Sequence, residues 1–343
     1  MIKEILQEGY ILKTKGYYKQ AIEAFYKVLE IDDTSCELFL EIAECYFYLQ
    51  DNERAINYIE IILDKKPTHI GSLNLLKTIF IKNNALKEAE QTAKNIYYIT
   101  KSLDDLVKIF QLLNKQQHYE EIFEYKIDAN SPELSYEKAY AKYHLKIYNE
   151  ALEYIDKCLN ETINNKFLLL KCKILLKINQ FDKIYEYIDK FDYTDLNAEQ
   201  LNFIGLIKQY ECNFKQALKY FEKAIKLDSK NDEYYYNYAS TCFKMNNLYL
   251  AKKYYNLAIS LAPKKDYYHF ALANLYYTEK NYKRALEELH YDFFEAKLLK
   301  AIILFDSGYI ALANSEFKKL LTEQPNNELL IDYKNKIEKI LKL

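Results

Sequence analysis

The stretch CNFKQALKYFEKAIKLD, residues 212–228, decides the fold because its pattern recurs along the whole chain. It carries a small residue, Ala217, followed four positions later by a large apolar one, Phe221. This spacing places both side chains on one face of a helix. The pair returns as Ala21 with Phe25, Ala55 with Ile59, Ala251 with Tyr255, Ala285 with Leu289 and Ala313 with Phe317. The chain is therefore predicted to be built from one helical unit used repeatedly.

The spacing of the small residue gives the length of that unit. The position of this residue falls at 21, 55, 89, 122, 151, 184, 217, 251, 285 and 313, in steps of 34, 34, 33, 29, 33, 33, 34, 34 and 28. Isoleucine replaces the small residue in two degenerate copies, at Ile122 and Ile184. The two short steps follow Ile122 and Ala285. There we expect the second helix of the unit to lose about one turn and the stack to bend.

The scarce glycines and prolines share this register. The chain has only 5 glycines and 4 prolines among 343 residues. Three prolines, Pro67, Pro263 and Pro325, fall twelve residues after the small residue, where a missing N–H ends a helix. Four glycines fall at one of two fixed places, in the first helix (Gly9, Gly205) or in the following turn (Gly16, Gly308).

This pattern resembles the tetratricopeptide repeat, a helix–turn–helix unit of about 34 residues. The resemblance covers essentially the whole chain. It implies an all-α fold, a right-handed superhelical solenoid of such repeats. We expect about ten repeats over residues 1–326, starting near residues 2, 36, 70, 103, 132, 165, 198, 232, 266 and 294. Residues 327–343 are predicted to form an amphipathic helix that caps the apolar end of the stack.

Charge and hydropathy restrict the class of protein. The 48 basic and 50 acidic residues give a net charge of −2, so the strong positive field of a nucleic-acid binder is not expected. No segment approaches the about 18 apolar residues that span a bilayer, and the first residues do not resemble a signal peptide. We predict a soluble, cytoplasmic protein without membrane insertion.

No pattern in the sequence indicates catalysis. Glycine-rich phosphate loops and the common zinc and calcium motifs are missing. The five histidines are scattered, and the six cysteines form no CxxC pair and fall mostly at packing positions. The prediction is a non-enzyme without catalytic residues, metal or cofactor.

The resemblance implies that the first helix of each repeat lines a concave face that holds a peptide or a partner helix. Tyrosines on that face offer contact area and a hydroxyl, and asparagines offer both a donor and an acceptor to a peptide backbone. The candidate contact residues are Tyr136, Tyr140, Tyr143, Tyr210, Tyr236, Asn237, Phe243, Tyr267, Phe270, Asn274 and Tyr277. The alternative is that these rings only pack across helix seams. In the run of tyrosines at 234–238, Tyr235 and Tyr238 are predicted to be core and Tyr236 to face the groove.

The sequence is compatible with three functions. The leading one is a non-catalytic protein–protein interaction scaffold or adaptor that binds a peptide or partner helix in the concave groove. The alternative is a substrate-targeting or assembly subunit for an enzyme on another chain. Single-stranded RNA binding is less favoured, because the charge is near neutral and the inner face carries Glu37, Glu41 and Glu44. The identity of the partner and the oligomeric state are not specified by these patterns.

Overall fold

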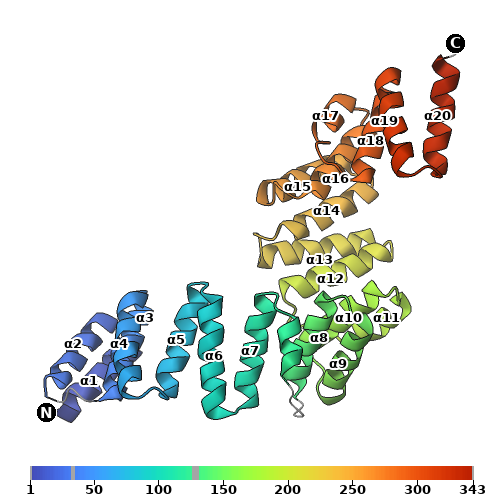
Figure 1. Ribbon diagram of the computed structural model, residues 1–343. Helices are drawn as coiled ribbons and strands as arrows, with labels where there is room; N and C mark the ends of the chain where they lie inside the picture. The colour runs from blue at the N-terminus through green and yellow to red at the C-terminus, as the bar shows by residue number, and fades with distance from the viewer. Residues whose placement is uncertain (1, 32–34, 126–130, 342–343) are drawn as a thin grey trace. The chain divides into compact units, whose positions relative to one another are not determined.

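Helices make up the regular structure of the chain (Figure 1). The computed structural model describes residues 2–31, 35–125 and 131–341, and these contain 20 α-helices, one 3-10 helix and no strand. The predicted all-α fold of helix–turn–helix repeats is thereby confirmed. The chain divides into two compact units, Met1–Phe191 and Asp192–Leu343, and we describe each by itself.

In the first unit, consecutive helices lie side by side in sequence order (Figure 1). Its helices are α1 (Ile2–Thr14), α2 (Tyr18–Leu29), α3 (Cys36–Tyr48), α4 (Asn52–Lys65), α5 (Ile70–Lys82), α6 (Leu86–Thr100), α7 (Leu103–Lys115), η1 (Glu120–Glu124), α8 (Pro132–His144), α9 (Tyr148–Glu161), α10 (Asn165–Lys177) and α11 (Phe181–Ile188).

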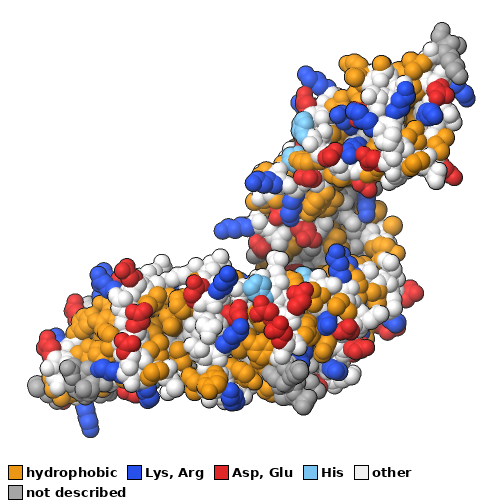
Figure 2. All heavy atoms as spheres, in the orientation of Figure 1, with side chains coloured by type: hydrophobic (Ala, Val, Ile, Leu, Met, Phe, Trp, Pro, Cys, Tyr) orange, Lys and Arg blue, Asp and Glu red, His pale blue; other side chains and the backbone are white. Residues whose placement is uncertain are grey.

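The second unit repeats the arrangement. Its helices are α12 (Ala198–Tyr210), α13 (Phe214–Leu227), α14 (Asp232–Lys244), α15 (Leu248–Leu261), α16 (Asp266–Thr278), α17 (Tyr282–Glu287), α18 (Phe294–Asp306), α19 (Ile310–Glu323) and α20 (Glu328–Leu341). On the visible face of each unit, basic and acidic side chains are largely interspersed (Figure 2).

The two helices of each pair are joined by one type of turn, in which a residue adopts the left-handed backbone conformation. In the first pair this residue is Gly16, and the N–H of Tyr17 donates to the carbonyl of Leu12 at 2.9 Å. This hydrogen bond closes the helix C-terminus in a Schellman motif. The equivalent left-handed residues are Gly16, Gln50, Asn84, Gln117, Lys146, Asn179, Cys212, Asn246, Lys280 and Gly308. The chain has these turns despite its low glycine content, because residues other than glycine adopt the strained left-handed conformation at most of them.

The core of each pair is organised around a small position in the first helix. A Cβ added to Gly9 would lie 2.5 Å from Cε1 of Phe25, and one added to Gly205 would lie 2.6 Å from Cε1 of Phe221. In these two pairs the first helix can approach the second one only because this position is small. The equivalent residues of the other pairs, all buried, are Ala43, Lys77, Phe110, Ala139, Cys172, Ala239, Ala273 and Ala301.

Both short steps in the repeat spacing coincide with short second helices. The second helix is the five-residue 3-10 helix η1 in one place and the six-residue α17 in the other, against 14 residues in α4 or α15. The predicted shortening is confirmed and exceeds one turn. In the sixth pair, α11 is also short, with eight residues.

Helix α20 covers the last helix pair. Leu330 and Ile337 of α20 are buried against α19, and the ring of Tyr333 stacks on Phe317 at 4.7 Å between centroids. Burying this face removes the apolar surface that an open repeat end exposes. Residues 342 and 343 of the predicted cap lie outside the described residues.

Candidate functional site

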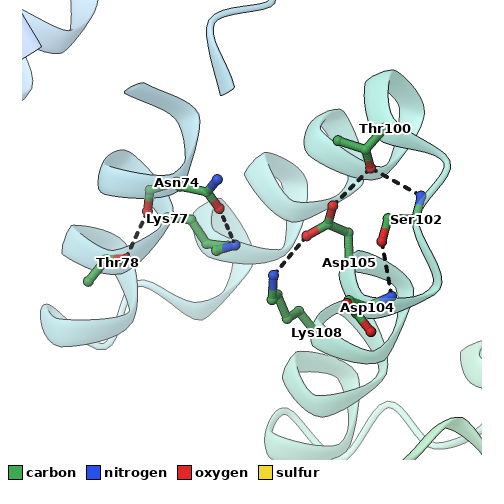
Figure 3. Close-up of polar contacts among 8 residues, drawn as sticks. All are labelled: Asn74, Lys77, Thr78, Thr100, Ser102, Asp104, Asp105 and Lys108. Carbon is green, nitrogen blue, oxygen red and sulfur yellow. Dashed lines mark hydrogen bonds and ion pairs between the residues drawn. The ribbon is translucent and has the colours of Figure 1, made fainter. Parts of the chain in front are cut away.

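Lys77 of α5 is a buried lysine near the polar side chains of α7 (Figure 3). Lys77 is only 7% exposed, and its ammonium donates to Oδ1 of Asn74 at 2.8 Å. Burial is the main cause that lowers the pKa of Lys77, and repulsion from Lys108 lowers it further. The residue stands at the small position described above, and Ala93 takes the place that Phe25 holds in the first pair. Sequence reasoning missed Lys77, although a lysine at a position that is small in eight of the nine other pairs was a readable signal.

Asp105 organises the polar contacts beside Lys77 (Figure 3). Its carboxylate accepts from Thr100 Oγ1 at 2.8 Å and from Lys108 Nζ at 2.9 Å. Burial alone would raise the pKa of Asp105, but the hydrogen bonds from Lys108 and Thr100 outweigh it and lower the pKa. These contacts hold a negative charge next to Lys108, and this negative charge also attracts the nearby charge of Lys77.

The predicted stripe Tyr136, Tyr140 and Tyr143 lies together on α8. All three rings are half-buried. Tyr136 and Tyr140 are 6.3 Å apart between centroids, and His144 packs against Tyr140 at 4.4 Å and Tyr143 at 5.2 Å. Tyr136 also stacks on Phe167 of α10 at 5.3 Å. The stripe therefore combines packing between helices with remaining exposed surface.

A pocket of about 330 Å³ opens beside this stripe. It is formed by α7, α8 and the start of α10. Its lining residues are Gln111, Asn114, Lys115, Tyr136, Glu137, Tyr140 and Lys166. Sequence reasoning selected the two tyrosines of this pocket but not the polar side chains between them.

In the second unit, Tyr236 lies inside a cluster of tyrosine rings. Its centroid is 4.8 Å from Tyr268, 5.2 Å from Tyr267 and 5.7 Å from Tyr255. Tyr268 is fully buried, whereas Tyr267 is 43% exposed. Tyr236 thus contributes to packing, and Tyr267 presents the accessible edge of the cluster.

Asn237 is engaged within the chain. It is buried, and its Nδ2 donates to Oδ1 of Asn202 on α12 at 2.9 Å. The hydrogen bond expected with a partner's backbone is made here between two first helices instead. Periodicity within one helix cannot reveal this contact, because the residues are 35 positions apart.

The tyrosine run differs from its predicted division. Tyr234 is buried, while Tyr235 is half-buried and donates its hydroxyl to the carbonyl of Ser229 at 3.1 Å. Tyr238 is also half-buried and packs on Tyr254 at 4.2 Å. The most buried ring of the run is thus one that helical spacing did not assign to the core.

The remaining candidate residues retain accessible surface. Tyr210 is 58% exposed at the end of α12. Phe243, Phe270, Asn274 and Tyr277 are half-buried. Tyr277 donates to Asp306 Oδ2 at 2.6 Å, a bond that raises its pKa. These residues lie on α12, α14 and α16, which are first helices of their pairs.

Four of the six cysteines are buried core residues. Burial raises the pKa of Cys158 and Cys172 to about 12 and that of Cys45 and Cys242 to about 11. A thiol with such a pKa is a poor nucleophile at neutral pH. Across residues 2–31, 35–125 and 131–341, no three His, Cys, Asp or Glu side chains come together as a metal site. In the same part of the chain, no helix has the length and apolar character to cross a membrane.

Comparisons with known proteins agree with the repeat architecture. A family model described as a tetratricopeptide repeat matches residues 5–35, 199–231 and 232–265. A TPR repeat-containing protein of Methanocaldococcus jannaschii is 33% identical over 114 residues, which are 33% of this chain and 19% of that protein. A DnaJ homolog subfamily C member 3 homolog of Dictyostelium discoideum is 23% identical over 220 residues, 62% of this chain and 41% of that protein. The chain thus spans less than half of each relative.

One solved structure supports the fold over nearly the full length. A chain in the crystal structure of the APC/C hetero-tetramer Cut9–Hcn1 matches with a TM-score of 0.60 at 12% identity. The match covers 98% of this chain and 76% of that one. The repeat spacing, the recurring helix pairs and these matches show that the chain is a tetratricopeptide repeat protein.

Proposed function

We propose that this protein is a non-catalytic interaction scaffold that binds a polypeptide segment of a partner on its first helices. The observation that carries the proposal is the aromatic face of α16. Tyr267, Phe270, Asn274 and Tyr277 follow one another at helical spacing and none is fully buried. Aromatic rings that stay accessible provide contact area at low cost in side-chain entropy, which suits a recognition surface.

Tyr210 of α12 adds to this surface in the second unit. Its ring is more exposed than that of Tyr267. In the first unit, Tyr136, Tyr140 and Tyr143 on α8 provide the corresponding aromatic row. Asn237 and Tyr236 have the supporting role of fixing the helices that carry the exposed rings.

Binding to an array of extended peptides of random sequence tests the proposal. We expect the full chain to retain a subset of peptides, and the double variant Tyr210→Ser/Tyr267→Ser to lose them. Tyr249→Ser is the matched control, because Tyr249 is as exposed as any ring described here but lies on a second helix, α15. Equal loss of binding in the control, or undiminished binding in the double variant at unchanged thermal stability, would refute the proposal.

A further inference from the structure

A residue that lines the pocket between α7, α8 and α10 carries a buried acceptor that no described residue of the chain satisfies. Asn114 and Glu137 are 7% and 5% exposed. Nδ2 of Asn114 donates to Glu137 Oε2 at 2.7 Å and to the Glu137 carbonyl at 3.1 Å. These two bonds fix the orientation of the amide, and its Oδ1 is buried without a hydrogen-bond partner among residues 2–31, 35–125 and 131–341. Buried polar atoms are nearly always paired, so this atom marks a place for a donor from outside the chain.

The same pocket already stabilises a positive charge. Nζ of Lys166, from α10, lies 3.6 Å from Oε1 of Glu137 and 3.8 Å from the ring centroid of Tyr136. The carboxylate and the ring face are both attractive to a cation. The Lys166 side chain is largely exposed, so its ammonium can move into water at small cost.

We infer that this pocket binds the guanidinium group of an arginine side chain from a partner, displacing the Lys166 ammonium. The inference rests on the proposed function only for the source of the arginine. A guanidinium is planar and carries five N–H donors, so one edge can reach Glu137 while another N–H reaches Asn114 Oδ1. Its flat face suits the rings of Tyr136 and Tyr140. Burial raises the pKa of Glu137, and an incoming cation offsets the cost of that buried carboxylate.

Other ligand classes fit these groups less well. A carboxylate has no donor for Asn114 Oδ1 and would meet the carboxylate of Glu137. Lys115, the other basic residue of the lining, is exposed at the rim, where water screens its charge. An ammonium is a compact charge and would repeat the contacts of Lys166.

The test is a titration of N-acetyl-arginine amide into the full chain. The NMR signal of the Asn114 side-chain amide reports binding. We expect a saturable shift with this probe and none with the neutral isostere N-acetyl-citrulline amide. Lys166→Ala should tighten binding by up to about fivefold, the upper range for removing a competing exposed ion pair. Glu137→Gln should weaken binding at least about tenfold, as expected for losing a charge-assisted hydrogen bond. Lys190→Ala is the matched control, because it removes another cation that lies over a tyrosine in this unit, and should change nothing.

Each result has a definite reading. Weaker binding after Lys166→Ala would show an anion site, and equal binding of the arginine and citrulline probes would show no charge recognition; either overturns the inference. Lys166→Ala alters an exposed residue, so the test does not depend on the stability of Glu137→Gln. Arginine binding without retention of any peptide on the array would sustain the pocket and remove the proposed function. Peptide retention without a preference for arginine would support the proposed function and overturn the arginine site.

Discussion

The buried hydrogen bond between Asn202 and Asn237 provides a sharp test of how the second unit is held together. Both side chains are buried, and the Nδ2 to Oδ1 distance is 2.9 Å. Replacing either asparagine by leucine leaves the other buried without this partner. An unsatisfied buried polar group costs about 1–3 kcal/mol, so each single variant should be destabilised by about 2 kcal/mol. Replacing both by leucine removes both polar groups and should be close to neutral.

A double-mutant cycle in urea measures this coupling. We expect the free energy of unfolding of the second unit to fall in Asn202→Leu and in Asn237→Leu, and to recover most of the loss in the double variant. With losses of about 2 kcal/mol in each single variant and little loss in the double variant, the interaction energy should be about 3–4 kcal/mol in magnitude, at the upper end of the range seen for residues in contact or slightly above it. Additive losses would contradict the pairing, as would an unchanged stability of Asn237→Leu accompanied by weaker peptide retention. That second outcome would return Asn237 to the partner-binding surface.

Three further predictions concern the core, the turns and pH. Gly205→Ala should lower the free energy of unfolding by about 1–3 kcal/mol through overpacking, because the added Cβ would meet the fully buried ring of Phe221. Gly71→Ala should be tolerated, because the atom nearest to its added Cβ is the end of a leucine side chain, Leu40 Cδ2. Thermal melts of the two variants test the difference. Lys280→Gly should raise the unfolding free energy by about 0.5–1 kcal/mol and Lys280→Ala should not, because only glycine adopts a φ of 58° without strain. The lowered pKa of Lys77 means that the folded state binds fewer protons than the unfolded state between that pKa and about 10.4. The free energy of unfolding of the unchanged chain should therefore increase as the pH rises through this window. The variant Lys77→Met should lack this increase, which urea midpoints measured at several pH values would show. Parallel pH profiles of the two proteins would contradict the prediction.

The repeat architecture was predictable from the sequence because it depends on local spacing. A small residue four positions before a large one, in steps near 34, identifies the face on which the two helices of a pair meet. The prolines and glycines fall in the same register because they act on the backbone locally. The shortened second helices near Ile122 and Ala285 were predictable for the same reason, since the missing residues change the step length.

The candidate site was only partly predictable. Helical spacing correctly placed Tyr136, Tyr140 and Tyr143 on one helix face. It did not find Asn114 or Glu137, because a polar residue on a first helix looks like an ordinary surface residue until its neighbours are known. The left-handed turn residues were equally hidden, since Lys146 and Lys280 adopt a conformation for which their side chains give no signal.

The sequence by itself determined the period, the helix pairs and the faces on which they pack, since these follow from the 3.6-residue periodicity and the backbone preferences of single residues. Only the tertiary structure decided that Tyr234 is the buried ring of its run, that Asn237 is paired with Asn202, and that Asn114 Oδ1 has no hydrogen-bond partner in the described part of the chain. Burial and hydrogen bonding at these positions are set by side chains of neighbouring helices, in two of the three cases more than 20 positions away in the chain. Their chemistry therefore emerges only when the helices are packed.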